Sequence, residues 1–267
     1  MSILDNYVSS PEKYYLLGLL WGDGYITHYK HTTSRYVYLG LIKEDMDDII
    51  NLFDNNWIIK NRKRAENRKI ISEAFLFDKN FGRFLVENDF SEKSTVSPTK
   101  ILSLIPEHFS NYFWRGYSDA DGCFYQNKEC FQYSISGSYE QDWSDTEKTL
   151  NNIGIKYSIN RRIQGNNKHS VLRISNRKDV IKFGDFIYSG DIFGFTRKYK
   201  KYLNITNHIS PTEKRRNEEI KIIKNISSFN DLTLKELSIL TGITNSRLMN
   251  LKKTINGDQR LDALSFS

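Results

Sequence analysis

The fold is decided by two copies of one short pattern, Leu16-Leu17-Gly18-Leu19-Leu20-Trp21-Gly22-Asp23-Gly24 and Trp114-Arg115-Gly116-Tyr117-Ser118-Asp119-Ala120-Asp121-Gly122. Each copy is mostly apolar and predicts a short helix that ends in Asp-Gly. Small residues recur at i and i+4 in both, Gly18 with Gly22 and Gly116 with Ala120. Small residues at this spacing let two helix backbones approach closely. We therefore expect the two helices to pack against each other.

If they do, Asp23 and Asp121 arrive side by side at the C-terminal ends of the two helices. That end of a helix already carries partial negative charge, and a second carboxylate nearby adds to the repulsion. Such a site favours a bound cation. The glycine that follows each acid, Gly24 and Gly122, is expected in the left-handed conformation that stops a helix.

The two motifs lie 121 − 23 = 98 residues apart and resemble the paired motifs of LAGLIDADG homing endonucleases, in the single-chain form that carries two copies. The resemblance implies that Asp23 and Asp121 are the metal-binding and catalytic acids. It also implies that the carbonyls of Gly22 and Ala120 are metal ligands, and that Mg²⁺ is the cofactor, with Mn²⁺ able to substitute.

The sequence departs from the family pattern at three positions. Trp21 stands where the first motif usually has Asp, and Trp114 and Arg115 stand where small or aliphatic residues are common. None of the three changes touches the terminal Asp-Gly.

One lysine follows the last helix of each repeat. It is Lys93, in Ser-Glu-Lys-Ser, in the first repeat and Lys198, in Thr-Arg-Lys-Tyr, in the second. Both resemble the family's catalytic lysine, which sits beside the metal pocket, holds solvent and offsets phosphate charge. Arg197 and Lys200 lie close enough in sequence to remain alternatives to Lys198.

Apolar periodicity predicts the order helix, hairpin, helix, hairpin, helix, twice over. The expected class is α+β, with two pseudo-symmetric αββαββα repeats at 1–100 and 101–208 and a small all-α domain at 209–267. The resemblance implies that the sheets of the two repeats form a DNA-binding saddle. Asp78 and Asn176 are expected N-caps of helices. Strands are expected at 25–29, 35–42, 57–64, 69–77, 123–126, 131–136, 155–163 and 170–175, and further helices at 45–53 and 143–153.

Composition sets bounds on the function. The chain has 267 residues and a net charge of +7, which favours a polyanionic partner. No stretch reaches the roughly 20 apolar residues of a membrane span, and no basic region followed by an apolar run opens the chain. We expect an intracellular protein, cytoplasmic or organellar and not secreted. Cys123 and Cys130 do not form a zinc spacing with the five histidines and read as reduced core or sheet residues.

Polar and basic side chains fall on the expected strands. A two-stranded ribbon fits the major groove, where Arg, Lys, Gln and Ser read base edges or hold phosphates. For a single residue, a solvated charge opposite the core explains the pattern equally well, but the set favours a DNA-binding face. The candidates are Tyr25, Thr27, Tyr29, Lys30, Arg35, Lys43, Lys60, Arg62 and Arg64 in the first repeat, and Tyr125, Gln126, Lys128, Gln132, Ser134, Ser136, Arg161, Arg162, Gln164 and Arg173 in the second.

The composition changes near Ile209. Residues 211–217 read as a polar, basic linker. Residues 232–240 read as a short helix, 241–243 as a turn and 244–253 as a second helix, which is the helix-turn-helix arrangement. Thr244, Asn245 and Arg247 are its candidate DNA contacts, and a helical cap that packs on the body is the alternative.

The sequence thus predicts a monomeric, Mg²⁺-dependent endonuclease that cleaves both strands of a long, asymmetric DNA site and needs no protein partner or membrane. One alternative is a maturase that binds intron RNA and assists splicing. Another is a non-catalytic transcription regulator with a LAGLIDADG-like body, against which the retention of Asp23 and Asp121 argues.

Overall fold

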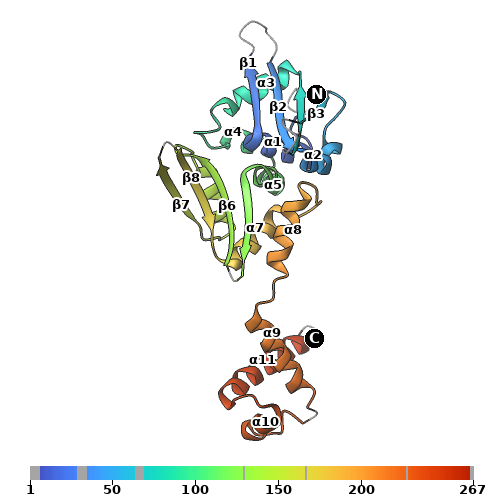
Figure 1. Cartoon of the computed structure of the whole chain (residues 1–267), viewed down its shortest axis with the longest axis vertical. Coiled ribbons are helices and arrows are strands. Elements are labelled where there is room, and N and C mark those ends of the chain that lie inside the picture. Colours follow the sequence, from blue (N-terminus) through green and yellow to red (C-terminus); the bar gives the residue numbers. More distant parts are fainter. Residues whose placement is uncertain are drawn as a thin grey trace. The chain divides into compact units, whose positions relative to one another are not determined.

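The computed structural model describes residues 7–28, 35–63, 69–128, 130–165, 167–226 and 228–264. The chain forms two compact units, Met1–Thr206 and Asn207–Ser267 (Figure 1). None of the described helices is long and apolar enough to cross a membrane. Three candidate DNA contacts, Tyr29, Lys30 and Arg64, lie outside the described residues.

The first repeat has the predicted order of helices and hairpins. Its elements are α1 (Pro11–Asp23), β1 (Gly24–His28), β2 (Arg35–Ile42), α2 (Lys43–Ile49), β3 (Trp57–Lys63), β4 (Ile70–Leu76) and α3 (Lys79–Glu87). The strands form one antiparallel sheet in the order β1-β2-β4-β3, which we call the first sheet. The carboxylate of Asp78 accepts from the N–H groups of Asn80 and Phe81, which confirms this N-cap.

The second repeat follows the same plan. Its elements are α5 (Ser110–Asp121), β5 (Gly122–Asn127), β6 (Cys130–Ser138), α6 (Ser144–Asn152), β7 (Ser158–Gln164), β8 (Asn167–Ile174) and α7 (Arg177–Ile187). The second sheet has the order β5-β6-β8-β7, the counterpart of the first. Asn176 caps α7 as predicted. The α+β fold with two pseudo-symmetric repeats is confirmed, and two helices were not predicted, α4 (Thr99–Ser103) and α8 (Thr196–Thr206).

Each sheet is covered by helices on one face only. In β2, Val37 and Leu39 are fully buried, while Tyr36 and Tyr38, which alternate with them, are half-buried. This alternation is typical of an antiparallel sheet with one face on the core. We call the face opposite the buried residues the open face of each sheet.

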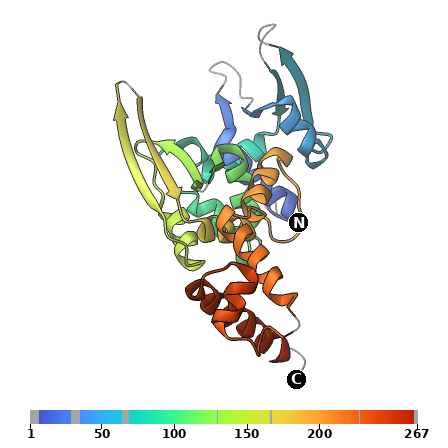
Figure 2. The same cartoon turned by 60° about the horizontal axis from the view of Figure 1, so that its bottom comes forward.

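Helices α1 and α5 lie at the centre of the unit Met1–Thr206, between the two sheets (Figures 1 and 2). A Cβ atom on Gly18 would lie 1.9 Å from the carbonyl oxygen of Phe113, and one on Gly116 would lie 2.0 Å from that of Tyr15. No side chain fits at these distances, so the predicted close approach through small residues is confirmed. Substitution of either glycine would force the two helices apart.

The glycines after the two acids are not left-handed, and that prediction is wrong. Gly24 has φ −78° and ψ 158°, and Gly122 has φ −80° and ψ 155°, both extended. Each is the first residue of a strand, so the chain leaves the helix directly into the sheet. Glycine is needed because a Cβ would lie 2.7 Å from the oxygen of Leu20 in one case and 2.6 Å from that of Ser118 in the other.

The unit Asn207–Ser267 contains three described helices around a core of its own. They are α9 (Pro211–Lys224), α10 (Leu234–Thr241) and α11 (Asn245–Leu264). The core includes Ile223, Leu237, Leu248 and Ile255. The predicted linker at 211–217 is wrong, because these residues open α9 behind a capping box formed by Ser210 and Glu213. Between α10 and α11, Gly242 has φ 69°, the left-handed conformation expected of the turn.

Candidate active site

Asp23 and Asp121 end α1 and α5 and lie together where the two helices meet. A Cβ on Gly22 would lie 3.1 Å from Oδ2 of Asp121 and 2.2 Å from Cβ of Ala120, so the two helix ends are in contact. Both acids are exposed residues, open to a ligand from solution.

The carboxyl groups are nevertheless crowded by protein. The pKa of Asp121 is raised to about 6, chiefly by burial and then by the negative charge of Asp23, against the opposing charges of Lys93 and Lys198. Burial also raises the pKa of Asp23, while Lys198 and Lys93 lower it. The site therefore holds two carboxyl groups whose negative charges are not fully balanced, which favours a cation.

Lys93 closes the C-terminal end of α1. Its Nζ donates to the carbonyl oxygens of Leu20 at 3.1 Å and Gly22 at 2.5 Å. It also lies 5.0 Å from the ring centre of Phe90. Burial lowers the pKa of Lys93 to about 8, against the nearby charges of Asp121 and Asp23. A positive charge at this end of a helix offsets the partial negative charge of its free carbonyls.

Lys198 does the same for α5. Its Nζ donates to the carbonyl oxygens of Ser118 at 2.9 Å, Ala120 at 3.2 Å and Gly122 at 2.7 Å, and to that of Asp119. The residue is buried, and burial lowers its pKa. The structure thus places both predicted lysines at the predicted acids.

Arg197 and Lys200, the alternatives to Lys198, do not donate to the end of α5 in the hydrogen bonds described above. The guanidinium of Arg197 forms a two-bond ion pair with Asp45, at 2.7 and 2.6 Å. Lys200 is exposed on α8. Thr196 adds hydrogen bonds to Asp48 at 2.8 and 2.9 Å, so the start of α8 is fixed to α2.

The donor set fits an oxygen-loving divalent cation. It consists of the carboxylates of Asp23 and Asp121 and the carbonyl oxygens of Gly22 and Ala120, and Mg²⁺ prefers oxygen ligands. The two carbonyls already accept from lysines, but a carbonyl oxygen has two lone pairs and can also face an ion. In the described part of the chain, no group of three or more His, Cys, Asp or Glu side chains could hold a metal.

The departure at Arg115 has a structural explanation. Its side chain is fully buried, and the guanidinium donates to the carbonyl oxygens of Ile187 at 2.5 Å and Ser189 at 2.9 Å, among others. It also lies between 4.9 and 5.6 Å from the ring centres of Tyr112, Phe193 and Tyr188. Arg115 therefore holds the segment between α7 and α8, which delivers Lys198.

Asp119 is almost fully buried and was not among the predicted site residues. Its Oδ2 accepts from the hydroxyl of Tyr15 at 2.8 Å and from the N–H of Phe195 at 2.9 Å. Burial raises its pKa to about 6, although the hydrogen bond from Phe195 lowers it. An acid within an apolar motif, two residues before the terminal Asp, was the available signal.

The first repeat replaces this polar anchor with an aromatic one. The position equivalent to Asp119 is 119 − 98 = 21, and Trp21 there is buried edge-on against Phe90, with ring centres 6.1 Å apart. Phe90 precedes Lys93 by three residues, as Phe195 precedes Lys198. Trp21 therefore supports Lys93 by packing, where Asp119 supports Lys198 by hydrogen bonding.

The strand register decides which candidate DNA contacts share the open faces. In the first sheet, Lys60 pairs with Glu73 and Arg62 with Ile71, alternating with Ile59 and Asn61 on the covered face. Tyr25 and Thr27 lie on the same open face, and Lys43 starts α2, where it pairs with Asp47. Of Arg35 and Gln164 only the strand positions are described.

In the second sheet, Gln126 and Arg161 are on the wrong face. Gln126 pairs with the buried Phe131, and Arg161 pairs with the buried Ser170. The guanidinium of Arg161 donates to the carbonyl oxygens of Tyr139 at 3.0 Å and Gln141 at 3.1 Å. The open face carries the remaining candidates of these strands, Tyr125, Gln132, Ser134, Ser136, Arg162 and Arg173.

The remaining candidate DNA contacts and the two cysteines lie outside the core. Lys128 lies in the β5–β6 turn with φ 51°. Cys123 and Cys130 are free and exposed on β5 and β6, so they are sheet residues but not core residues. Thr244 and Asn245 are exposed, whereas Arg247 forms an ion pair with the buried Glu219 of α9.

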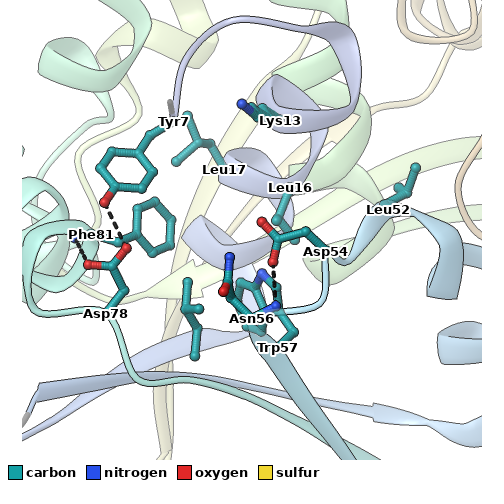
Figure 3. Close-up of a pocket in the computed structure, with 11 residues that line it drawn as sticks. Tyr7, Lys13, Leu16, Leu17, Leu52, Asp54, Asn56, Trp57, Asp78 and Phe81 are labelled. Carbon is teal, nitrogen blue, oxygen red and sulfur yellow. Dashed lines mark hydrogen bonds between the residues drawn. The ribbon is translucent and has the colours of Figure 1, made fainter. Parts of the chain in front are cut away.

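A cavity of about 390 Å³ lies apart from these residues, against the start of α1 and the ends of β3 and β4 (Figure 3). Both of its carboxylates have hydrogen-bond donors. The carboxylate of Asp78 accepts from the hydroxyl of Tyr7 at 2.8 Å while capping α3, and Asp54 accepts from the N–H of Asn56 at 2.9 Å. The cavity contains none of the paired acids and lysines.

Comparison with known protein families gives a match to part of the chain. Residues 108–188, within the second repeat, match the LAGLIDADG-like domain. No curated protein matches the chain significantly. The match to the LAGLIDADG-like domain lies in the second repeat, and the sheet of the first repeat has the same strand order.

One solved structure is similar to this chain at the level of the fold, and two others align with lower scores. The homing endonuclease I-WcaI bound to its DNA recognition sequence aligns with a TM-score of 0.51 and 18% identity, over 74% of this chain and 92% of that one. The meganuclease I-SmaMI bound to uncleaveable DNA aligns at 0.49 and 13%, over 89% and 99%. Full-length DUF199/WhiA from Thermatoga maritima aligns at 0.44 and 17%, over 94% and 93%.

Proposed function

We propose that this protein is a site-specific DNA endonuclease that cleaves both strands of a double-stranded target with Mg²⁺, for which Mn²⁺ substitutes. The observation that carries the proposal is the pairing of Asp23 with Asp121 at the touching ends of α1 and α5. Each acid has a lysine of its own repeat beside it. The DNA-bound state of I-WcaI supports the assignment of DNA as the substrate.

The residues at the site have distinct tasks. Asp23 and Asp121, with the carbonyls of Gly22 and Ala120, would hold the divalent ion. When bound, such an ion polarises the phosphate and makes a bound water acidic enough to attack. Lys93 and Lys198 place positive charge where a scissile phosphate would lie and offset the charge that develops on it during hydrolysis.

The open faces provide the DNA-binding surface. Lys60, Arg62, Arg162 and Arg173 lie on them and suit phosphate or base-edge contacts. One chain carries both sheets, so a monomer covers both halves of a site. Because the two sheets differ in sequence, the target is long and not palindromic. We place this activity inside the cell, in the cytoplasm or an organelle.

A cleavage assay tests the proposal. Supercoiled plasmids that carry the DNA flanking the gene, joined as an uninterrupted sequence, are incubated with the full chain and Mg²⁺ or with a chelator. We expect linear product with Mg²⁺ and none with the chelator. Binding of this DNA without any cleavage would contradict the proposal and favour the regulator, while selective binding of intron RNA without cleavage would favour the maturase.

A further inference from the structure

The open face of the first sheet carries a row of apolar side chains where an antiparallel sheet normally shows polar ones. Tyr25, Tyr38, Phe75 and Ile58 are cross-strand partners on β1, β2, β4 and β3. The ring centres of Tyr25 and Tyr38 are 4.5 Å apart, and those of Tyr38 and Phe75 are 5.2 Å apart. Tyr25 and Ile58, at the two ends of this aromatic row, are each 46% exposed.

The second sheet has a polar row at the equivalent place. This polar row consists of cross-strand partners in the same register, Cys123, Ser134, Arg173 and Ser158. Cys123 follows Asp121 by two residues, as Tyr25 follows Asp23. The backbone is therefore duplicated while the chemistry of the row is not. A fold that needed only a soluble surface here would carry polar residues on both sheets.

Further contacts extend and fix the aromatic row. Tyr36 lies 5.9 Å from Phe75 and 5.2 Å from Phe77, ring centre to ring centre, and Phe77 is 60% exposed. The hydroxyl of Tyr38 donates to Glu73 at 3.0 Å, which holds its ring in place. The face is an ordered apolar surface, and apolar patches of this kind mark binding sites.

Basic side chains next to the row indicate the ligand. Lys60 and Arg62 follow Ile58 on the same face of β3, and both are exposed. An apolar protein surface would not complement these charges, whereas the phosphates of DNA do. In the major groove, the 5-methyl group of thymine is the apolar feature that such side chains contact.

We propose that the aromatic row reads one half of the target through the methyl groups of thymines, while the polar row reads the other half by hydrogen bonds. This inference rests on the proposed function and names the specificity-determining residues of one half-site, Tyr25, Tyr38, Phe75 and Ile58. The thymine-reading half is the one bound by the first sheet.

The experiment removes only the methyl groups. A duplex site is selected from a random-sequence pool by the full chain in chelator, so that no cleavage occurs. The two cysteines of the chain, Cys123 and Cys130, are exposed on the second sheet. A photo-crosslinker attached to Cys130, in the variant Cys123→Ser so that the polar row carries no label, marks the half-site of that sheet. Thymine is then replaced by uracil in one half at a time, and the affinity of each duplex is titrated.

We expect a thymine-rich first-sheet half in which uracil weakens binding about fourfold per contacted methyl, the equivalent of about 0.8 kcal/mol for one buried methyl-sized group. Uracil in the other half should change affinity less than twofold. The double variant Tyr25→Ser/Ile58→Ser, at exposed positions, should abolish the uracil effect. The control variant Ile50→Ser, at an exposed isoleucine outside both sheets, should leave it unchanged.

Three results overturn the inference. A selected site without a uracil effect in the first-sheet half overturns it and leaves the proposed function intact. Preference of the full chain for single-stranded oligothymidine over the duplex points to base stacking and also overturns it. Failure to select any duplex site contradicts the proposed function, and the inference falls with it.

Discussion

Asp119 Oδ2 accepts a hydrogen bond from the main-chain N–H of Phe195 across 2.9 Å, and this bond ties the second motif helix to the segment that begins α8. Phe195 lies three residues before Lys198, so the bond helps to set the position of that lysine over the end of α5. The acid therefore acts through another residue and is a positioning residue.

Removing the carboxylate should destabilise the body of the protein. Asp119→Leu leaves the hydroxyl of Tyr15 and the N–H of Phe195 without an acceptor in a buried place, which costs about 2–5 kcal/mol. Tyr15→Phe removes one of the two donors together with its need for a partner and should cost less. Urea unfolding followed by circular dichroism measures both, and equal stability of Asp119→Leu and the parent would contradict this role.

The raised pKa of Asp121 predicts a pH dependence of stability. Its folded pKa of about 6 lies above its ordinary value of 3.8, so the folded state binds the proton more tightly. This contribution is fully present below about pH 4 and is lost as the pH rises through about 6.

In metal-free buffer, the stability difference between the parent and Asp121→Asn should therefore shift against the parent between pH 4 and 7. Added Mg²⁺ should restore parent stability at pH 7, because the ion favours the ionised carboxylate. Denaturant titrations at several pH values measure this. A difference that does not change with pH or with Mg²⁺ would speak against a cation site.

Arg62 and Arg162, on the open faces, should contribute to DNA binding, and Arg161 should not. Arg62 and Arg162 are equivalent in register, whereas Arg161 lies on the covered face. Arg62→Ala or Arg162→Ala should cost roughly 1 to 3 kcal/mol and relax preference at one position if the contact is to a base, or weaken all sequences alike if it is to phosphate.

Arg161→Ala is the matched control, with unchanged binding and about 1 kcal/mol less stability from its lost bonds to main-chain carbonyls. Titration of each variant with DNA duplexes that carry single base changes in the target shows whether the side chain contacts a base, a phosphate or neither. Weaker binding of Arg161→Ala than of Arg162→Ala would reverse the assignment of the faces.

This pair of arginines shows where sequence reasoning stopped. Alternation along a strand predicts that Arg161 and Arg162 lie on opposite faces, but it does not say which one is covered. The partner across the ladder decides it, Ser170 in one case and His169 in the other, and that pairing is a tertiary fact. The motif helices were predictable because small residues at i and i+4 leave few other ways to pack.

Capping residues predicted some helix starts correctly and others not. Asp78 and Asn176 were recognised as N-caps from their place before apolar periodicity. The capping box of Ser210 and Glu213 gave the same kind of signal, but the basic residues around it suggested a linker. The extended conformation of Gly24 was not predictable, because it depends on the strand that the chain enters.

A chain ended after His208 should keep the catalytic body, because the unit Met1–Thr206 holds both acids and both lysines. The residues from 209 onward carry ten Lys and Arg against seven Asp and Glu. If they bind DNA, the shortened protein should give a shorter footprint and a smaller salt dependence, because fewer phosphate contacts release counterions. The same footprint and salt slope in a folded truncated protein would assign the tail to a structural role.

The central claim is that Asp23 and Asp121 together form one cleavage site, and nicking of a supercoiled plasmid carrying the target tests it most directly. Asp23→Asn and Asp121→Asn are compared with Asp47→Asn, a surface acid paired with Lys43. We expect each of the first two variants to lose linear product while binding the target within about twofold of the parent, because ion ligation is lost and the phosphate-contacting surface remains. Undiminished linear product from either variant would remove that residue from the site and contradict the account.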